Sequence, residues 1–261
     1  MTMQISLISL SVQILTLAAL LALSVKLIRE SGRNMTAVFW SFYLALWLLG
    51  DLYWLIYDLM RPEIRMPFAA NEIGEAALFL FLAATINSAR KHHTNLPFGY
   101  LAGTLFFALS NMILWIMWSG EIVQDVVSGA IFAWLFYCIV RSLRSEQVLT
   151  KAQWILLCII CCALIASEAL TFVVSEDMKN VPDFCGYMIL IAGTVFFVYM
   201  LIRAYRRGQT DALLFLSFSL SIWLKVSLYM SADNWYNLYL TLETPGVLLC
   251  YLAVRKAVRN V

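Results

Sequence analysis

Charged residues are scarce in this chain of 261 residues. Asp, Glu, Lys and Arg make up 13% of it, whereas soluble domains carry about 25%. Histidine is scarcer still, with two residues, both in the stretch RKHHTN at 90–95, where we expect them to lie at a membrane surface and to carry no chemistry. Because 62% of the residues are hydrophobic and almost all lie in or beside an apolar run, a sizeable soluble domain is excluded.

Motifs for catalysis or metal binding are also missing. The six cysteines all lie in apolar runs, and no spacing among them indicates a disulfide framework or a zinc site. There is no nucleophile elbow, no His-rich cluster and no Ser–His pair, so we name no catalytic residue, metal ligand or cofactor. The basic residues are scattered loop anchors, which gives no support for nucleic-acid binding.

Long apolar runs dominate what is present. A spanning helix needs about 20 apolar residues, and nine runs approach or exceed this length. The runs lie at 5–28, 36–60, 68–89, 97–118, 121–142, 150–174, 183–204, 210–231 and 235–254. We therefore predict an all-α polytopic membrane protein with nine transmembrane helices, folded as a single transmembrane domain over 1–261.

The placement of the basic residues predicts an orientation. Fourteen of the 18 Lys and Arg residues flank one side of the runs, three flank the other and Lys225 lies inside a run. The positive-inside rule places the side with fourteen in the cytoplasm. The N-terminus is then outside and the C-terminus is cytoplasmic, in the inner (cytoplasmic) membrane of a cell.

Runs two to nine suggest one helical hairpin repeated four times after an extra first span at 1–33. The proposed hairpins cover 34–95, 96–148, 149–208 and 209–261. Each rising run has one polar residue before the outer turn, namely Asp51, Asn111, Glu168 and Lys225, spaced by 60, 57 and 57 residues. A fixed long period is typical of repeated supersecondary units that pack on one another.

Ionisable residues deep in these runs are the candidate functional residues. Charged groups in hydrocarbon should face the bundle interior and pair, or line a water-filled cavity. We predict an acidic cavity, open to the outside, with Lys225 as its one cation, paired with Asp51 or Glu168. The candidate ligand-binding residues are Asp51, Glu72, Glu75, Asn111, Asp125, Glu168, Asp183, Lys225, Glu243, Trp54 and Tyr57.

Simpler roles remain open for most of these residues. Glu72, Asp125 and Asp183 fall near predicted helix starts, where a carboxylate caps free amides and complements the helix dipole. The deeper residues Asp51, Glu168, Lys225 and Glu243 could form a purely structural ion-pair network. Trp54 and Tyr57 could belong to an aromatic belt at the membrane interface or could line a site for an organic cation.

The hairpin GDLYWLIYD…MPFAANEIGEAALFLFLAA resembles the multi-span sensory regions that precede diguanylate cyclase (GGDEF) domains in bacteria. In those regions, a span that contains a Gly-Asp pair and aromatic residues is followed by a turn with a proline. An acidic residue then begins the next span. This resemblance implies a bacterial membrane sensor, although no catalytic domain follows Val261. A fainter likeness to the lysoplasmalogenase-like YhhN family concerns Gly50 and Asp51.

Three functions remain open. The first is a module that binds or senses a small cationic or amphipathic ligand from outside and acts through a membrane or cytoplasmic signalling partner. The second is a secondary transporter for a cation or a cation-coupled solute. The third is a membrane-embedded lipid hydrolase in which Asp51 and Glu168 or Glu243 form an acid–base pair. We favour the first, a protein that is not an enzyme.

Overall fold

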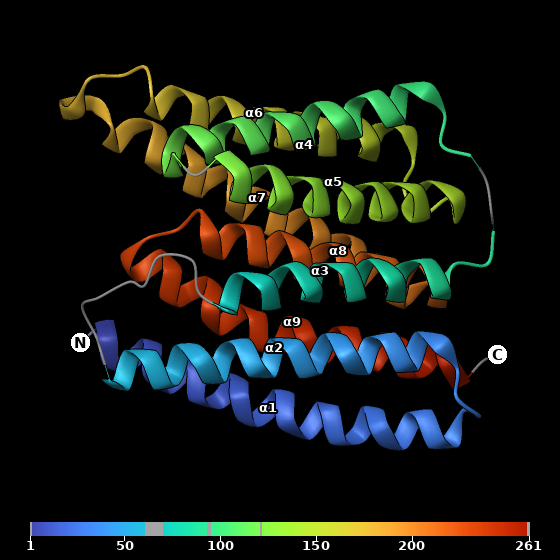
Figure 1. Ribbon diagram of the computed structural model, residues 1–261. Coiled ribbons are helices and arrows are strands. Elements are labelled where there is room, and N and C mark those ends of the chain that lie inside the picture. The colour runs from blue at the N-terminus through green and yellow to red at the C-terminus, as the bar shows by residue number, and fades with distance from the viewer. Residues whose placement is uncertain (1, 61–69, 93–94, 121, 260–261) are drawn as a thin grey trace. The chain divides into compact units, whose positions relative to one another are not determined.

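The computed structural model describes residues 2–60, 70–92, 95–120 and 122–259, and every regular element in these ranges is helical. The order is α1 (Thr2–Glu30), α2 (Met35–Met60), α3 (Ala70–Ala89), α4 (Phe98–Ser119), α5 (Ile122–Ser145), α6 (Lys151–Thr171), η1 (Glu176–Met178), α7 (Asn180–Arg206), α8 (Thr210–Tyr229) and α9 (Asp233–Arg259). Figure 1 shows these helices, coloured in order along the chain. The predicted all-α class is confirmed.

Eight of these helices are long and apolar enough to cross a membrane. The chain is therefore a multi-pass membrane protein. The apolar part of α3 described here, Ile73–Ala89, is shorter than the other eight. A ninth span, the orientation and the fourfold repeat stay predictions.

Local sequence signals explain several helix boundaries. Thr150 caps α6 because its side chain accepts a hydrogen bond from the Gln153 backbone amide while the Gln153 side chain accepts one from the Thr150 amide, which satisfies two free donors. The α4 helix is capped by Gly120, directly after Ser119, and the φ of 75° at Gly120 is a left-handed conformation that glycine adopts without strain. Such caps satisfy backbone groups at the helix ends that have no partner within the helix.

The α9 helix runs without a break through Pro245. Residues 234–240, at the start of this helix, are all helical. A proline inside a helix removes the N–H that would bond to the carbonyl four residues earlier, here the carbonyl of Thr241. Transmembrane helices tolerate this loss when neighbouring helices or side chains satisfy the freed group.

The chain forms two compact units. Unit 1 comprises residues 1–89 and 217–261, and unit 2 comprises residues 90–216. The α8 helix contributes its first residues to unit 2 and the rest to unit 1. Each unit is described by itself below.

In unit 1, α1 packs against both α2 and α9. Side-chain hydrogen bonds join Ser6 to Asn237 at 3.1 Å and Ser9 to Thr241 at 3.0 Å, so residue numbers rise together along α1 and α9 and the two helices are parallel. The buried core includes Trp40 of α2, whose ring centroid lies 5.8 Å from that of Phe218 of α8. This packing surrounds the polar cluster described in the next subsection.

In unit 2, α4 packs on α5 and on α6, and α6 packs on α7. The α4–α5 contact contains Phe107 and Phe136, whose ring centroids are 4.7 Å apart. Gly129 of α5 lies directly against Met112 of α4. The absence of a side chain at Gly129 therefore permits the close approach of these two helices.

Candidate functional site

Lys225 of α8 is a buried cation in the interior of unit 1. Its side chain is 13% exposed, and its Nζ atom lies 3.3 Å from Oε2 of Glu243, which is 1% exposed. The ammonium also lies 4.7 Å from the ring centroid of Trp47 and 5.8 Å from that of Tyr229. A carboxylate and two aromatic rings thus surround the charge, a combination that stabilises a desolvated cation.

Glu243 of α9 also receives a hydrogen bond from α1. The Nε2 atom of Gln13 donates to Glu243 Oε2 at 3.2 Å, and Gln13 is fully buried. This bond continues the series Ser6–Asn237 and Ser9–Thr241 along the α1–α9 contact. Three helices, α1, α8 and α9, therefore meet at one carboxylate.

Two more carboxylates lie in the same cluster. Asp51 of α2 is 7% exposed. Its carboxyl group interacts with the Gln13 amide and with the charges of Lys225, Glu243 and Glu75. Glu75 of α3 is hydrogen-bonded to Tyr229 and also feels the charge of Lys225. The cluster thus combines residues from all five helices of unit 1, with three carboxylates and one ammonium.

Several buried oxygen atoms of this cluster lack a donor. Within the described residues, Asp51 Oδ2, Glu243 Oε1 and Gln13 Oε1 have no hydrogen-bond partner. Buried polar atoms are nearly always hydrogen-bonded, to protein or to water, and a carboxylate oxygen without a donor inside a membrane protein is costly. The cluster therefore has spare acceptor atoms, and it holds more carboxyl groups than ammonium groups.

The aromatic candidates lie further along α2. The rings of Trp54 and Tyr57 meet edge to face with centroids 5.9 Å apart, and Tyr53 stacks on Tyr57 at 6.1 Å. All three are half-buried. Their position one to two turns beyond Asp51 fits both an interface belt and a lining of the route to the cluster.

Four of the predicted site residues belong to unit 2. Asn111 of α4 is buried and donates to the Phe107 carbonyl of its own helix at 2.8 Å. Asp125, in the first turn of α5, accepts a hydrogen bond from the Ser119 hydroxyl at the end of α4. Both side chains therefore have local partners, and the Ser119–Asp125 bond joins the end of α4 to the start of α5.

Glu168 and Asp183 lie near each other across the α6–α7 contact. Glu168 is half-buried and feels the charge of Asp183, which is exposed. Its Oε1 atom lies 3.6 Å from the position that a Cβ atom on Gly186 would occupy. No basic side chain balances Glu168 among the interactions described for it, in contrast to Glu243. The side chain of Glu72 lies outside the described residues, and a single cavity that contains all the candidates stays a prediction.

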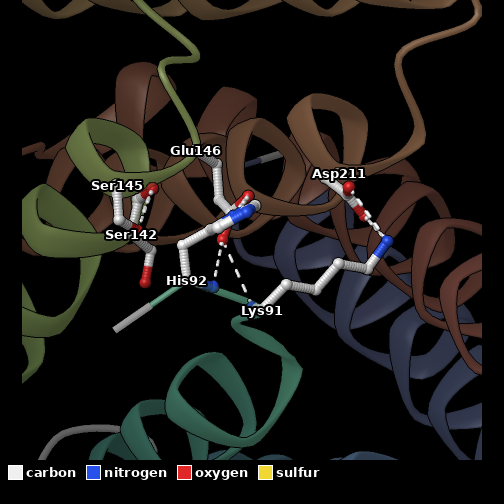
Figure 2. A network of polar contacts seen from close by, with 6 residues as sticks. All are labelled: Lys91, His92, Ser142, Ser145, Glu146 and Asp211. Carbon is white, nitrogen blue, oxygen red and sulfur yellow. Dashed lines mark hydrogen bonds and ion pairs between the residues drawn. The ribbon is translucent and has the colours of Figure 1, made fainter. Parts of the chain in front are cut away.

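The three acidic residues on the predicted cytoplasmic side, Glu30, Glu146 and Asp211, each lie against a basic side chain. Glu30 pairs with Arg259 at 2.7 Å, and Asp211 pairs with Lys91 at 3.0 Å. Figure 2 shows the second of these with a neighbouring contact, in which the Glu146 carboxylate faces the His92 ring at 3.0 Å. Glu146 Oε1 also accepts the backbone amides of Lys91 and His92, so this carboxylate fixes the segment that precedes α4.

Sequence reasoning missed Gln13, Trp47 and Tyr229. Gln13 had a usable signal, because it is the single amide side chain in the apolar run 5–28. The first run lies outside the proposed fourfold repeat, however, so the sequence gave no reason to expect a contact between Gln13 and α9. Trp47 and Tyr229 had no such signal, since the chain has nine Trp and 12 Tyr residues.

Comparison of the chain with protein-family models, with curated proteins and with solved structures finds no match. The resemblances to the sensory regions and to the YhhN family stay predictions. The function must therefore be argued from the site.

We predict that Lys225→Met destabilises the protein by about 3–5 kcal/mol, because it leaves the buried Glu243 carboxylate without its ion-pair partner. The double variant Lys225→Met/Glu243→Gln should be more stable than Lys225→Met alone. The measurement is the free energy of unfolding in mixed micelles.

The matched control is Lys91→Met, which removes an ion pair whose lysine side chain is 57% exposed. Exposed pairs contribute about 0–1 kcal/mol. Equal losses for Lys225→Met and Lys91→Met would contradict the burial of the Lys225–Glu243 pair.

Proposed function

We propose that unit 1 binds a small organic cation, an ammonium ion with N–H donors, at the cluster formed by Gln13, Asp51, Glu75, Lys225 and Glu243. The observation that carries this proposal is the set of buried oxygens without donors on Gln13, Asp51 and Glu243. An ammonium group supplies both the positive charge and the N–H donors that these oxygens lack. Such charge-assisted hydrogen bonds are stronger than neutral ones.

The surroundings of Lys225 support the same ligand class. Its own ammonium lies against the Glu243 carboxylate and over the Trp47 ring, which is the chemistry that proteins use to recognise ammonium ligands. No group of three His, Cys, Asp or Glu side chains among the described residues is placed to hold a metal ion. These facts favour a nitrogen cation over a divalent metal.

The predicted orientation indicates the side of the membrane from which the ligand reaches the cluster. Asp51, Lys225 and Glu243 belong to the predicted outer half of their helices, so the ligand enters from outside the cell. We propose that the protein is a sensor in the inner membrane, which passes the bound state to a partner through helix faces or cytoplasmic loops. The predicted resemblance to bacterial sensory regions agrees with this role.

Binding is tested with methylammonium, tetramethylammonium and sodium added to the purified protein, with calorimetry as the readout. Methylammonium should bind more tightly than tetramethylammonium, which has no N–H donor. Asp51→Asn should weaken methylammonium binding by about tenfold or more, since a hydrogen bond to a charged group contributes about 1.5–3 kcal/mol.

The control for this test is Asp177→Asn, which removes the same charge from an exposed position in unit 2. The affinity of this variant for methylammonium should match that of the unchanged protein. Failure of every cation to bind at millimolar concentration, or equal affinities for Asp51→Asn and Asp177→Asn, would remove the proposed site.

Transport of a cation is the second candidate function, and the charge imbalance favours it. Three carboxylates share one ammonium in the cluster, so neutrality requires protons or a bound cation. A group that exchanges a proton for a cation can couple the movement of the two across a membrane.

Transport is tested by uptake of labelled methylammonium into proteoliposomes with an imposed pH gradient. A transporter should show uptake that depends on the gradient and is lost in Asp51→Asn. A sensor should bind the cation without uptake. Flux that survives both Asp51→Asn and Lys225→Met would exclude these residues from transport.

A further inference from the structure

A polar pocket lies at the end of unit 2 where the α5–α6 loop meets the α7–α8 loop. It encloses about 400 Å³, including its open mouth, and its polar lining comes from Gln147, Gln153, Arg203, Arg207 and Gln209. All of these residues belong to unit 2. The pocket is separate from the cluster of unit 1 proposed above to bind a cation.

Local structure fixes the walls of this pocket. The capping box between Thr150 and Gln153 fixes the start of α6, and the Gln153 Nε2 atom lies 3.1 Å from the sulfur of Met200 on α7. Gln147 has a φ of 51°, which turns the chain between α5 and α6. The walls are therefore held by bonds within the protein and do not need a ligand to form.

The pocket carries unbalanced positive charge. The side chains of Arg203 and Arg207 have no acidic partner in the part of the chain that the structure describes. The two nearest acids in the sequence, Glu146 and Asp211, are already paired with His92 and Lys91, as Figure 2 shows. Lys91 thus neutralises Asp211, and Glu146 is bound by the His92 ring and two backbone amides. Neither acid is paired with an arginine of the pocket, so both guanidinium groups are available.

The arrangement of the two arginines fits a phosphate group. Arg203 and Arg207 are one helical turn apart at the end of α7, so their side chains can reach one anion from the same wall. The guanidinium group binds phosphate oxygens through two parallel N–H bonds. The amides of Gln147 and Gln209 add neutral donors at the pocket wall.

We propose that this pocket binds a phosphate group, carried by an anionic phospholipid headgroup or by a free phosphate compound. The predicted orientation places the pocket at the cytoplasmic membrane surface. Basic pockets between helices on that side bind anionic headgroups. The shared chemistry is a phosphate held by two guanidinium groups, and the source of the phosphate is decided by experiment.

The test measures thermal unfolding of the full chain in detergent with added short-chain phosphatidylglycerol, phosphatidylcholine of the same chain length, or inorganic phosphate. Phosphatidylglycerol should stabilise the unchanged protein more than phosphatidylcholine. Arg203→Gln/Arg207→Gln should weaken this binding by about tenfold or more, since each arginine supplies charge-assisted hydrogen bonds. Arg207→Gln alone, at an exposed position, should give a partial loss with the fold intact.

The matched control is Arg206→Gln, which removes an exposed arginine in the last turn of α7 that does not line the pocket. The affinity of this variant for phosphatidylglycerol should stay within about twofold of that of the unchanged protein. Equal stabilisation by inorganic phosphate identifies a soluble phosphate as the ligand, and stabilisation by phosphatidylglycerol alone identifies a lipid. The proposal is overturned if neither binds, or if Arg207→Gln and Arg206→Gln weaken binding equally.

Discussion

The ion pair between Lys225 and Glu243 is the interaction on which the organisation of unit 1 depends. A lysine in a membrane-spanning helix is tolerated only where the protein replaces its lost hydration, and here Glu243, Trp47 and Tyr229 do so. Glu243 is in turn held by Gln13 of α1. One buried charge therefore fixes the relative positions of α1, α2, α8 and α9, and the further carboxylates of Asp51 and Glu75 give the cluster its excess of acceptors.

The two polar networks of the chain differ in what surrounds them. The cluster of unit 1 is enclosed among helices, so each unpaired oxygen is costly and a ligand that satisfies it can gain substantial free energy. In unit 2 the Lys91–Asp211 pair is partly solvated and contributes little to stability. Its consequence is local, since it neutralises Asp211, which is adjacent in the sequence to the pocket residue Ala212.

Much of the fold could be predicted from the sequence because apolar length and helix breaks are local properties. The nine apolar runs correspond to the nine long helices of the described ranges. The depth of Asp51, Lys225 and Glu243 also pointed to the site, since charge inside an apolar run needs a partner. The identity of that partner was not predictable: Lys225 was expected to pair with Asp51 or Glu168, but its ion pair is with Glu243. Which helices become neighbours depends on tertiary packing, and for the same reason the contribution of Gln13 from α1 was missed.

The central claim is that Lys225, Glu243 and Asp51 form one enclosed cluster inside the membrane. The most direct measurement is an experimental structure of the protein in lipid nanodiscs, determined with and without saturating methylammonium. The account predicts Lys225 beside Glu243 and over Trp47 in both states, with added density against Asp51 when the cation is present. A structure in which Lys225 faces lipid, or in which Asp51 and Glu243 lie on separate faces with no shared space, would contradict it.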